Sequence, residues 1–415
     1  MAAFGRGKEF VAGVFLAVIT LSNVVVVPGL LPFLRSGYQN FTIFYTAGKM
    51  VRSGQTAALY DLSVQYQAQQ QFAPDVRIRQ AALPYNHPPF EALLFVPFTF
   101  FGYWTAYLFW TALNIILLAA SLAVLTKQFA EVGNLSSAFL GLAAAGFFPV
   151  VSAIIQGQDC ILLLFFYVIA LAAFEKEQDV IAGAVLAAGL FRFQLVLPLV
   201  LILAVRRWRL LVGFAPVAGL LAGVSVAMIG WRGAFDYVWL VLSLEKSGAV
   251  GSIVAVGMPN LRGIIAGMPG VDAGSKSVVV LTFVCSIIVA VMAMWRIRTG
   301  RDSARCSFAL ATVAAVLVSY HALTYDLSLL LPSMLLLFSA PGMRAPRETQ
   351  ADIMLLVLLF LIPRFELLGH SLSPLGWFAL LLVWLLGRLS RGQTAPGDFA
   401  CSSLGRSRTI PSMGR

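Results

Sequence analysis

The stretch YWTAYLFWTALNIILLAASLAVL, residues 103–125, has no charged side chain. A helix of this length rises about 34 Å and can cross the hydrocarbon core of a bilayer, which is roughly 30 Å thick. The rest of the chain has the same character, since 60% of its 415 residues are hydrophobic, 11% are charged and the mean hydropathy is +0.87. Soluble domains average about 25% charged residues. The sequence therefore predicts an all-α, polytopic bundle of membrane helices.

Apolar runs recur along the chain and predict twelve spans in total. The first, residues 10–34, follows two basic residues and is too long for the apolar part of a signal peptide, so we expect it to remain as a membrane span. Residues 180–205 are ambiguous, because they form either two spans or one tilted helix that carries Arg192 in mid-membrane. Beyond residues 103–125, the spans are expected at residues 135–155, 160–174, 180–191, 193–205, 210–230, 277–295, 306–321, 327–340, 353–367 and 375–386.

A polar insert, residues 35–102, separates the first two spans. Polar and apolar residues alternate in it without reaching spanning length, and residues 41–53 and 62–72 are typical of short helices on a membrane surface. Residues 89–101 form an apolar segment of 13 residues, which is shorter than the roughly 20 residues of a membrane span. We expect this segment to be re-entrant or interfacial.

The positive charges predict the orientation of the chain. There are 29 Lys and Arg against 18 Asp and Glu, which gives a formal net charge of +11. Twelve spans place the basic turns 206–209, 296–305 and 344–347 on the side of both termini, and the positive-inside rule assigns that side to the cytoplasm. We expect residues 1–388 to be the transmembrane domain and residues 389–415 to be a disordered basic tail in the cytoplasm. The conspicuous polar clusters then fall on the opposite face.

Cysteine and histidine usage predicts neither a disulfide framework nor a metal centre. The four cysteines lack CxxC spacing, and only three histidines are present. We expect no required cofactor, and the sequence does not indicate a divalent metal.

The first candidate site follows the first span, in residues 40–54, NFTIFYTAGKMVRSG. Asn40 lies where a span passes into an interfacial helix, so its side chain can face both water and a lipid substrate. The alternative is structural, with Asn40 as a helix N-cap and Gly54 as a helix C-cap.

The second candidate is LPYNHPPFE, residues 83–91. Pro88 and Pro89 prevent a helix from running through this segment and present His87 at the membrane boundary. His87 could donate a hydrogen bond or a proton to a phosphate oxygen. The alternative is a capped turn before a membrane helix.

The third candidate consists of two hairpin tips that the topology places on the same face. One tip carries Gln158 and Asp159, and the other carries Arg192. An Arg among lipids is costly and needs an anionic partner, either Asp159 or a substrate phosphate. Snorkelling of Arg192 to the interface is the structural alternative.

The fourth candidate is SYHALTYD, residues 319–326. It brings His321, Tyr325 and Asp326 to one helix junction. Ionisable groups within a membrane domain favour a function, because burying them is costly.

The fifth candidate is MPNLRG, residues 258–263, in an external loop. Asn260 and Arg262 are its polar residues. Taken alone the signal is weak, because a Pro-Asn turn followed by Arg is common.

The order of these motifs resembles glycosyltransferase family 87. The series is N-F-x-x-F-Y-x-A-G-x(5)-G-x(4)-L-Y-D, H-P-P-F, G-Q-D, A-G-x(3)-A-x-G-L-x-R, R-R-W-R, P-N-x-R-G and Y-H-x(3)-Y-D, and it covers roughly residues 10–340. The resemblance implies a GT-C-like fold and transfer of a hexose, with mannose among the candidates, from a polyprenyl-phosphate donor to an acceptor hydroxyl with inversion. It also implies membrane lipids and a glycolipid or glycan acceptor as partners, no nucleic acid, and a bacterial plasma membrane with the active face outside.

The resemblance also suggests roles for the candidate residues. Similar proteins carry Asp as the presumed base where this chain has Asn40, and an amide cannot accept the proton. Asp61, Asp159 and Asp326 are the available replacements, of which the last two rank first because they lie beside other polar candidates. A phosphate leaving group needs cations or hydrogen-bond donors. The candidate substrate-binding residues are His87, Gln158, Arg192, Asn260, Arg262, His321 and Tyr325.

Two other functions fit the same residues. A transporter or flippase of a lipid-linked sugar would also use many spans, but it would place its binding groups near the bilayer midplane on broken helices. A non-catalytic homologue is the other alternative, because Asn40 replaces the expected Asp.

Overall fold

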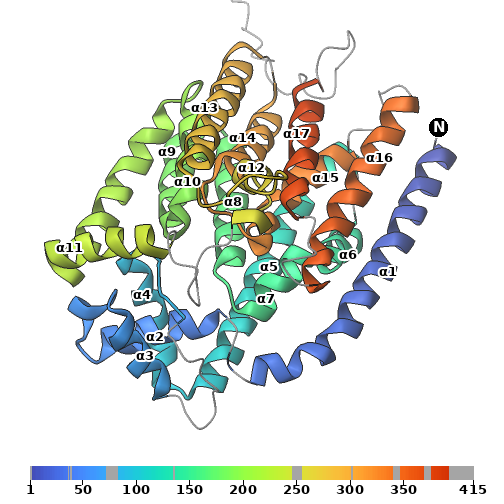
Figure 1. The fold of residues 1–415 in the computed structure, drawn as a ribbon. Helices are drawn as coiled ribbons and strands as arrows, with labels where there is room; N and C mark the ends of the chain where they lie inside the picture. The colour runs from blue at the N-terminus through green and yellow to red at the C-terminus, as the bar shows by residue number, and fades with distance from the viewer. Residues whose placement is uncertain are drawn as a thin grey trace, which may run out of the picture.

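The computed structural model describes residues 2–35, 37, 40–71, 83–133, 136–244, 255–300, 302–339, 346–368 and 375–391. Within these residues every regular element is helical, with 17 α-helices and several short 3-10 turns. The prediction of an all-α polytopic bundle is confirmed (Figure 1). Some predicted features lie outside the described residues. They are residues 344 and 345 of the predicted basic turn 344–347, and residues 392–415 of the predicted tail.

Four helices are long and apolar enough to cross a membrane. They are α1 (Ala2–Arg35), α5 (Tyr103–Gly133), α11 (Arg209–Leu244) and α13 (Lys276–Thr299). Two further pairs of helices meet at bends of 68° and bring the total to six if each pair is one span. These pairs are α6 (Ser137–Gly146) with α7 (Phe148–Gln156), and α9 (Asp179–Ala188) with α10 (Phe193–Ala204).

The predicted number of twelve spans is not confirmed, because several apolar runs form helices shorter than a bilayer. Helix α8 (Cys160–Glu175) has 16 residues and rises about 24 Å, which is less than a hydrocarbon core of roughly 30 Å. The other short helices are α12 (Leu261–Ala266), α14 (Ala304–Val318), α15 (Leu331–Ser339), α16 (Pro346–Leu361) and α17 (Leu375–Arg391).

Helices α9 and α10 are separate, so the alternative of one continuous helix over residues 180–205 is wrong. A 3-10 turn, Leu190–Arg192, interrupts the helix. Arg207, just after α10, forms an ion pair of 3.0 Å with Asp179 at the start of α9. The chain therefore runs to Arg192 and returns, which leaves Arg192 at a tip.

Glycines set the spacing between α9 and α11. A Cβ at Gly183 would overlap the carbonyl oxygen of Leu210, and a Cβ at Gly213 would overlap that of Val180. Small residues allow this close approach of membrane helices. The packing fixes α9 and, through the turn that follows it, the position of Arg192.

The polar insert forms the predicted short helices at one end of the bundle (Figure 1). They are α2 (Phe41–Arg52), α3 (Leu62–Gln70) and α4 (Pro89–Phe95), which the 3-10 helix Val96–Phe100 continues. Aromatic rings hold them together, since Phe44 and Phe95 stack at 4.6 Å and Trp110 of α5 lies 4.7 Å from Phe95. The insert is thus packed against the first long span that follows it.

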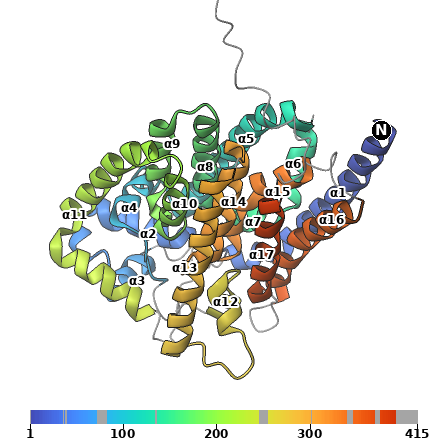
Figure 2. The same cartoon turned by 90° about the horizontal axis from the view of Figure 1, so that it is seen from above.

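Helix α11 bends at Gly230, where the backbone has φ 68° and ψ 177°. A positive φ is strained for residues with a side chain, so the glycine permits the bend. Figure 2 shows α11 curving round one side of the bundle while α1 lies at the opposite edge. Beyond the bend, Leu240 and Leu244 join the aromatic cluster of the insert.

Candidate active site

A tight turn between α7 and α8 presents two of the predicted residues. Gly157 has the left-handed backbone that ends α7, with φ 63°, and Gln158 and Asp159 follow it. Trp110 Nε1 donates a hydrogen bond of 2.9 Å to the Gly157 carbonyl, and a Cβ at Gly157 would collide with Phe41. The turn is therefore held by α5 and by the first residue of α2.

Arg192 binds Asp159 directly. Its Nε lies 2.9 Å from Oδ1 and 3.1 Å from Oδ2, and its Nη2 lies 2.6 Å from Oδ1. The same nitrogen also donates to the side-chain oxygen of Gln158. Both charged side chains are almost fully buried, Arg192 with 2% exposure. Asp159 is thus the anionic partner in this structure, and the snorkelling alternative is wrong because Arg192 does not reach the surface.

Asp326 joins the same group from the far end of the chain. Its Oδ1 lies 3.6 Å from Arg192 and accepts a hydrogen bond of 3.1 Å from the Cys160 thiol. Its Oδ2 accepts a hydrogen bond of 2.8 Å from the backbone N–H of Leu323. The ring of Tyr325 lies 5.4 Å from the Arg192 guanidinium carbon. The guanidinium is therefore held by protein groups on several sides.

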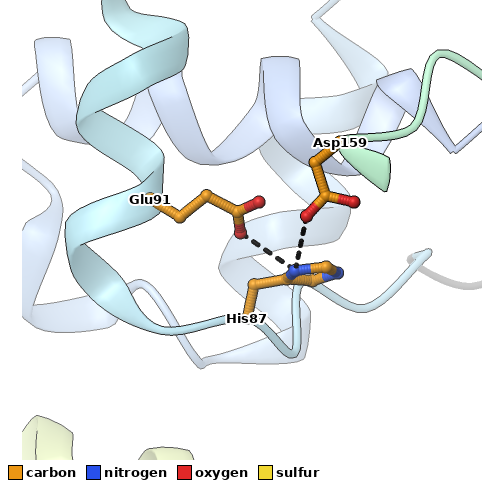
Figure 3. A group of neighbouring side chains, drawn as sticks. All are labelled: His87, Glu91 and Asp159. Carbon is orange, nitrogen blue, oxygen red and sulfur yellow. Dashed lines mark ion pairs between the residues drawn. The ribbon is translucent and has the colours of Figure 1, made fainter. Parts of the chain in front are cut away.

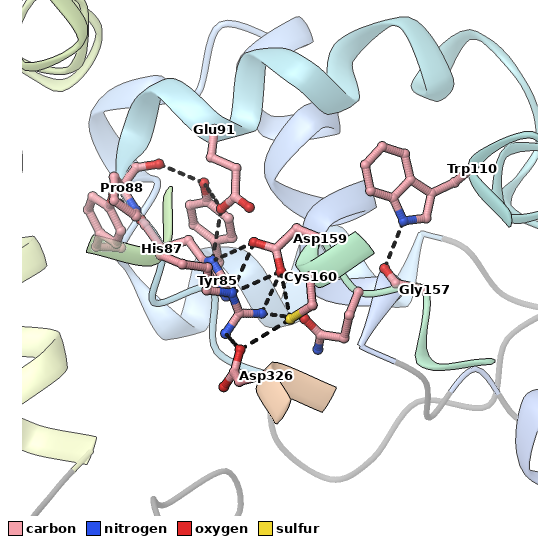
Figure 4. Close-up of polar contacts among 12 residues, drawn as sticks. Tyr85, His87, Pro88, Glu91, Trp110, Gly157, Asp159, Cys160 and Asp326 are labelled. Atoms are coloured by element: carbon pink, nitrogen blue, oxygen red, sulfur yellow. Dashed lines mark hydrogen bonds and ion pairs between the residues drawn. The ribbon is translucent and has the colours of Figure 1, made fainter. Parts of the chain in front are cut away.

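His87 and Glu91 complete this group (Figures 3 and 4). His87 Nδ1 lies 2.9 Å from Oε2 of Glu91 and 3.9 Å from Oδ2 of Asp159. Pro89 starts α4, and one helical turn separates His87 from Glu91, so both side chains reach the same point. We call the buried group of His87, Glu91, Gln158, Asp159, Cys160, Arg192 and Asp326 the polar cluster.

Tyrosines fix the backbone around His87. Tyr60 donates a hydrogen bond of 2.7 Å to the His87 carbonyl, and Tyr85 donates one of 2.9 Å to the Pro88 carbonyl. Burial, together with the positive charge of Arg192, lowers the pKa of His87 to about 3. The imidazole is therefore neutral at physiological pH and can act as a ligand or a hydrogen-bond partner.

Asn260 and Arg262 lie at the start of α12, against the turn that follows α14. Asn260 caps α12, since its Oδ1 accepts a hydrogen bond of 2.9 Å from the Gly263 N–H. Its Nδ2 donates a hydrogen bond of 2.8 Å to the Ser319 carbonyl. Arg262 lies over the ring of Tyr320 at 4.1 Å. Asn260 thus has a clear structural role, which joins α12 to the turn after α14.

His321 is buried in the turn that follows α14, close enough to Arg192 and Arg262 for their charges to act on it. Burial and then these two charges lower the pKa of His321 to about 3. Its Nδ1 is buried and has no hydrogen-bond partner among the described residues. Of the predicted phosphate-binding groups, this nitrogen is one that the fold leaves unsatisfied.

Asn40 does not act as the expected helix cap. It stands at the N-cap position of α2 with helical backbone angles, φ −66° and ψ −17°, and its side chain makes no capping hydrogen bond. The next residue, Phe41, packs on Gly157 of the turn that carries Asp159. The prediction for Gly54 is better supported, because it follows α2 with a positive φ of 76°.

Residues 85–319 match the family model described as glycosyltransferase family 87. This range is more than half of the chain. The chain belongs to glycosyltransferase family 87. No curated protein and no solved structure matches it.

The part that matches family 87 covers most of the polar cluster. Three of its segments meet in the structure, around His87, Asp159 and Arg192. Asn40 lies before the matched range, and His321, Tyr325 and Asp326 lie after it. The structure nevertheless brings the late segment into the cluster, through Asp326.

Two members of the cluster were not predicted as site residues, Glu91 and Cys160. Glu91 had a signal in the sequence, because it is an acidic residue in an apolar helix, four positions after His87. Cys160 had none, since its contact with Asp326 joins residues 166 positions apart. The ligand atoms of His87, Glu91 and Asp159 lie within 4.8 Å of one another, so these residues could hold a cation.

Proposed function

We propose that this family 87 protein is an integral membrane hexosyltransferase. It would transfer a hexose, with mannose among the candidates, from a polyprenyl phosphate to an acceptor hydroxyl on a glycolipid or glycan. The observation that carries the proposal is the convergence of segments from the family match on one buried polar cluster. Ionisable groups buried within a membrane protein are costly and mark functional sites.

The chemistry requires two separate functions from the cluster. The acceptor oxygen attacks the anomeric carbon, the bond from that carbon to the phosphate oxygen breaks, and the electron pair leaves with the polyprenyl phosphate. Donors must stabilise this leaving group. His321 and Arg262 suit this role, with His87, Gln158, Arg192, Asn260 and Tyr325 as further candidates.

The proton of the acceptor hydroxyl needs an acceptor of its own. The amide of Asn40 cannot accept this proton. Asp61 already caps α3, where its side chain accepts a hydrogen bond of 2.8 Å from the Ser63 N–H. Asp159 and Asp326 remain the candidates. Both are buried and both contact Arg192, so the two carboxylates stay as equal candidates for the base.

We also infer a GT-C-like topology, in a bacterial plasma membrane, with both termini in the cytoplasm and the cluster facing outward. The support is the separation of charge along the bundle. Helix α8 starts at the cluster with Cys160 and ends at Glu175, which pairs with Arg305 in the basic turn 296–305. Basic turns normally face the cytoplasm.

Transfer by the purified full-length protein tests the function. The protein in nanodiscs is incubated with radiolabelled polyprenyl-phosphate hexoses and a panel of acceptor lipids. We expect labelled product from the parent, and Asn40→Asp should raise turnover tenfold or more if the site keeps its geometry, because a general base contributes about 10²- to 10⁴-fold. Asn40→Ala is the matched control. A parent and an Asn40→Asp variant that transfer no hexose to any acceptor would rule out the enzyme.

One observation favours the alternative of a lipid-linked sugar transporter. Arg192 lies at the break between α9 and α10, and transporters often bind substrate at broken helices. Reconstituted vesicles with a fluorescent polyprenyl-phosphate sugar distinguish the two functions. Movement between leaflets without sugar transfer would support the transporter.

A further inference from the structure

Three side chains of the polar cluster have the geometry of a metal site (Figure 3). His87 Nδ1 lies 2.9 Å from Glu91 Oε2 and 3.9 Å from Asp159 Oδ2, and the three ligand atoms fall within 4.8 Å of one another. First-row dications bind imidazole nitrogen and carboxylate oxygen at about 2.0–2.2 Å. Two ligands of one such ion are then about 3 Å apart when adjacent and about 4.3 Å apart when opposite. One ion between them can therefore reach all three atoms after side-chain shifts of about half an ångström or less.

The charges of the cluster are unbalanced. Glu91, Asp159 and Asp326 are all buried, with exposures of 0 to 1%. Among the described residues, Arg192 is the cation that contacts Asp159 and Asp326, whereas Glu91 contacts the imidazole of His87. Three carboxylates and one guanidinium leave two negative charges when all are ionised. Uncompensated buried charge is strongly unfavourable. A dication would neutralise this excess.

Glu91 provides a second, independent observation. Its Oε1 is buried and has no hydrogen-bond partner among the described residues, although the residue is fully buried. A buried carboxylate oxygen normally has a partner, and a lone one requires an explanation. A bound cation would satisfy this oxygen, for which the described part of the chain offers no hydrogen-bond donor.

Arg192 makes its shortest contacts with Oδ1 of Asp159, at 2.6 and 2.9 Å. Oδ2 faces His87 at 3.9 Å and also accepts a hydrogen bond of 3.1 Å from Arg192 Nε, so an ion would share this oxygen with the arginine. Hydrogen bonds to a ligating carboxylate orient it, as outer-shell partners commonly do in metal sites.

We propose that His87, Glu91 and Asp159 bind one divalent transition-metal cation, of the class of Mn²⁺ or Zn²⁺. One imidazole with two carboxylates suits these ions better than Mg²⁺ or Ca²⁺, which prefer oxygen ligands. A site with three protein ligands keeps positions for substrate oxygens. Resting on the proposed function, the ion would bind a donor phosphate oxygen or the acceptor hydroxyl, and it would lower the pKa of a bound hydroxyl where Asn40 has replaced a base.

Mn²⁺ binding to the purified full-length protein tests the site without any sugar. The protein is stripped with EDTA and titrated with Mn²⁺, and the bound ion is followed by electron paramagnetic resonance. We expect one ion per chain and a hyperfine coupling from imidazole nitrogen. Glu91→Gln should weaken binding at least about tenfold, and His87→Ala should remove the nitrogen coupling. Glu175→Gln is the matched control, because Glu175 pairs with Arg305 away from the cluster, and it should bind Mn²⁺ like the parent.

The result that would overturn the site is a parent that binds no Mn²⁺ and no Zn²⁺ in a parallel titration, or equal binding by the parent and Glu91→Gln. Should Glu91→Gln fail to fold, the stoichiometry and the nitrogen coupling of the parent decide the question. Sugar transfer that persists in EDTA, with no bound metal, would reject the cation and leave the transferase intact. Metal binding without transfer would support the site and reject the proposed function.

Discussion

The two ends of the bundle use arginine and carboxylate in opposite ways. At the basic end, each of three carboxylates has an arginine partner, Asp179 with Arg207, Glu175 with Arg305 and Asp302 with Arg296. In the polar cluster, as far as the structure describes it, Asp159 and Asp326 share Arg192, and Glu91 has the imidazole of His87 in place of an arginine. The side chains of the basic-end pairs are mostly 13 to 22% exposed, whereas those of the cluster's carboxylates are at most 2% exposed.

Three short helices connect these two ends. Helix α8 leads from Cys160 to Glu175, α10 leads from Arg192 toward Arg206, and α14 leads from the Arg305 turn toward Ser319. Their 12 to 16 residues correspond to about 18 to 24 Å. Balanced, partly exposed pairs are sufficient to anchor a helix end. At the other end, the polar cluster buries more carboxylates than cations, which is unfavourable for stability. This difference indicates that the polar cluster, and not the basic end, serves a function.

The largest effect is expected from Asp159→Asn. The change leaves Arg192 buried without its closest anionic partner, and breaking a buried ion pair costs about 3–5 kcal/mol. Glu175→Gln at the basic end should cost less, about 1 kcal/mol, since this pair is partly exposed and the partner left behind can still reach water. Denaturant unfolding in detergent measures both variants. Equal losses in the two variants would remove the energetic distinction between the ends.

A second prediction separates function from stability at Glu91. Removing one excess negative charge with Glu91→Gln should change the free energy of unfolding by about 1 kcal/mol or less, because the side chain loses an unfavourable charge as well as a contact. Sugar transfer should nevertheless fall at least tenfold if the cluster is the active site. Initial rates of transfer and unfolding curves on the same preparation are compared. A variant that is less stable but equally active would make Glu91 a structural residue.

The third prediction concerns pH. Burial lowers the pKa of His87 and of His321 to about 3, from about 6.5 in the unfolded chain. Between about pH 3 and pH 6.5 the unfolded state therefore binds more protons than the folded state. The contribution of the two histidines to the free energy of unfolding is fully present above about pH 6.5 and is lost as the pH falls toward 3. The melting temperature should therefore be lower at pH 5 than at pH 7.5. In His321→Gln the difference between the two pH values should be smaller. The opposite trend, with higher stability at pH 5, would show that these imidazoles are charged in the folded protein.

The smallest effect is expected from Arg305→Lys at the basic end. Lysine keeps the charge beside Glu175 and loses only the planar fork of the guanidinium. We expect a change below about 1 kcal/mol and unchanged transfer, measured as for Glu175→Gln. Loss of transfer in this variant would mean that the basic end takes part in the reaction.

The sequence determined the membrane class, the helical fold and the polar segments. Long uncharged stretches such as residues 103–125 leave helices as the stable solution in lipid, because the backbone must satisfy its own hydrogen bonds there. The helices of the insert were also predictable, since their amphipathic patterns are local. Local patterns similarly marked Asp159, Arg192 and Asp326 as costly ionisable groups.

Only the tertiary structure decided the number of long helices and the composition of the cluster. Whether residues 180–205 break at Arg192 depends on packing against α11, where Gly183 meets Leu210. The contact of Cys160 with Asp326 and the approach of His87 to Asp159 join segments far apart in the chain, for which one sequence holds no signal. Asn40 is a further case, because its backbone angles, and not its residue type, prevent its side chain from capping α2. Composition fixes what must be buried, and packing alone fixes which buried groups meet.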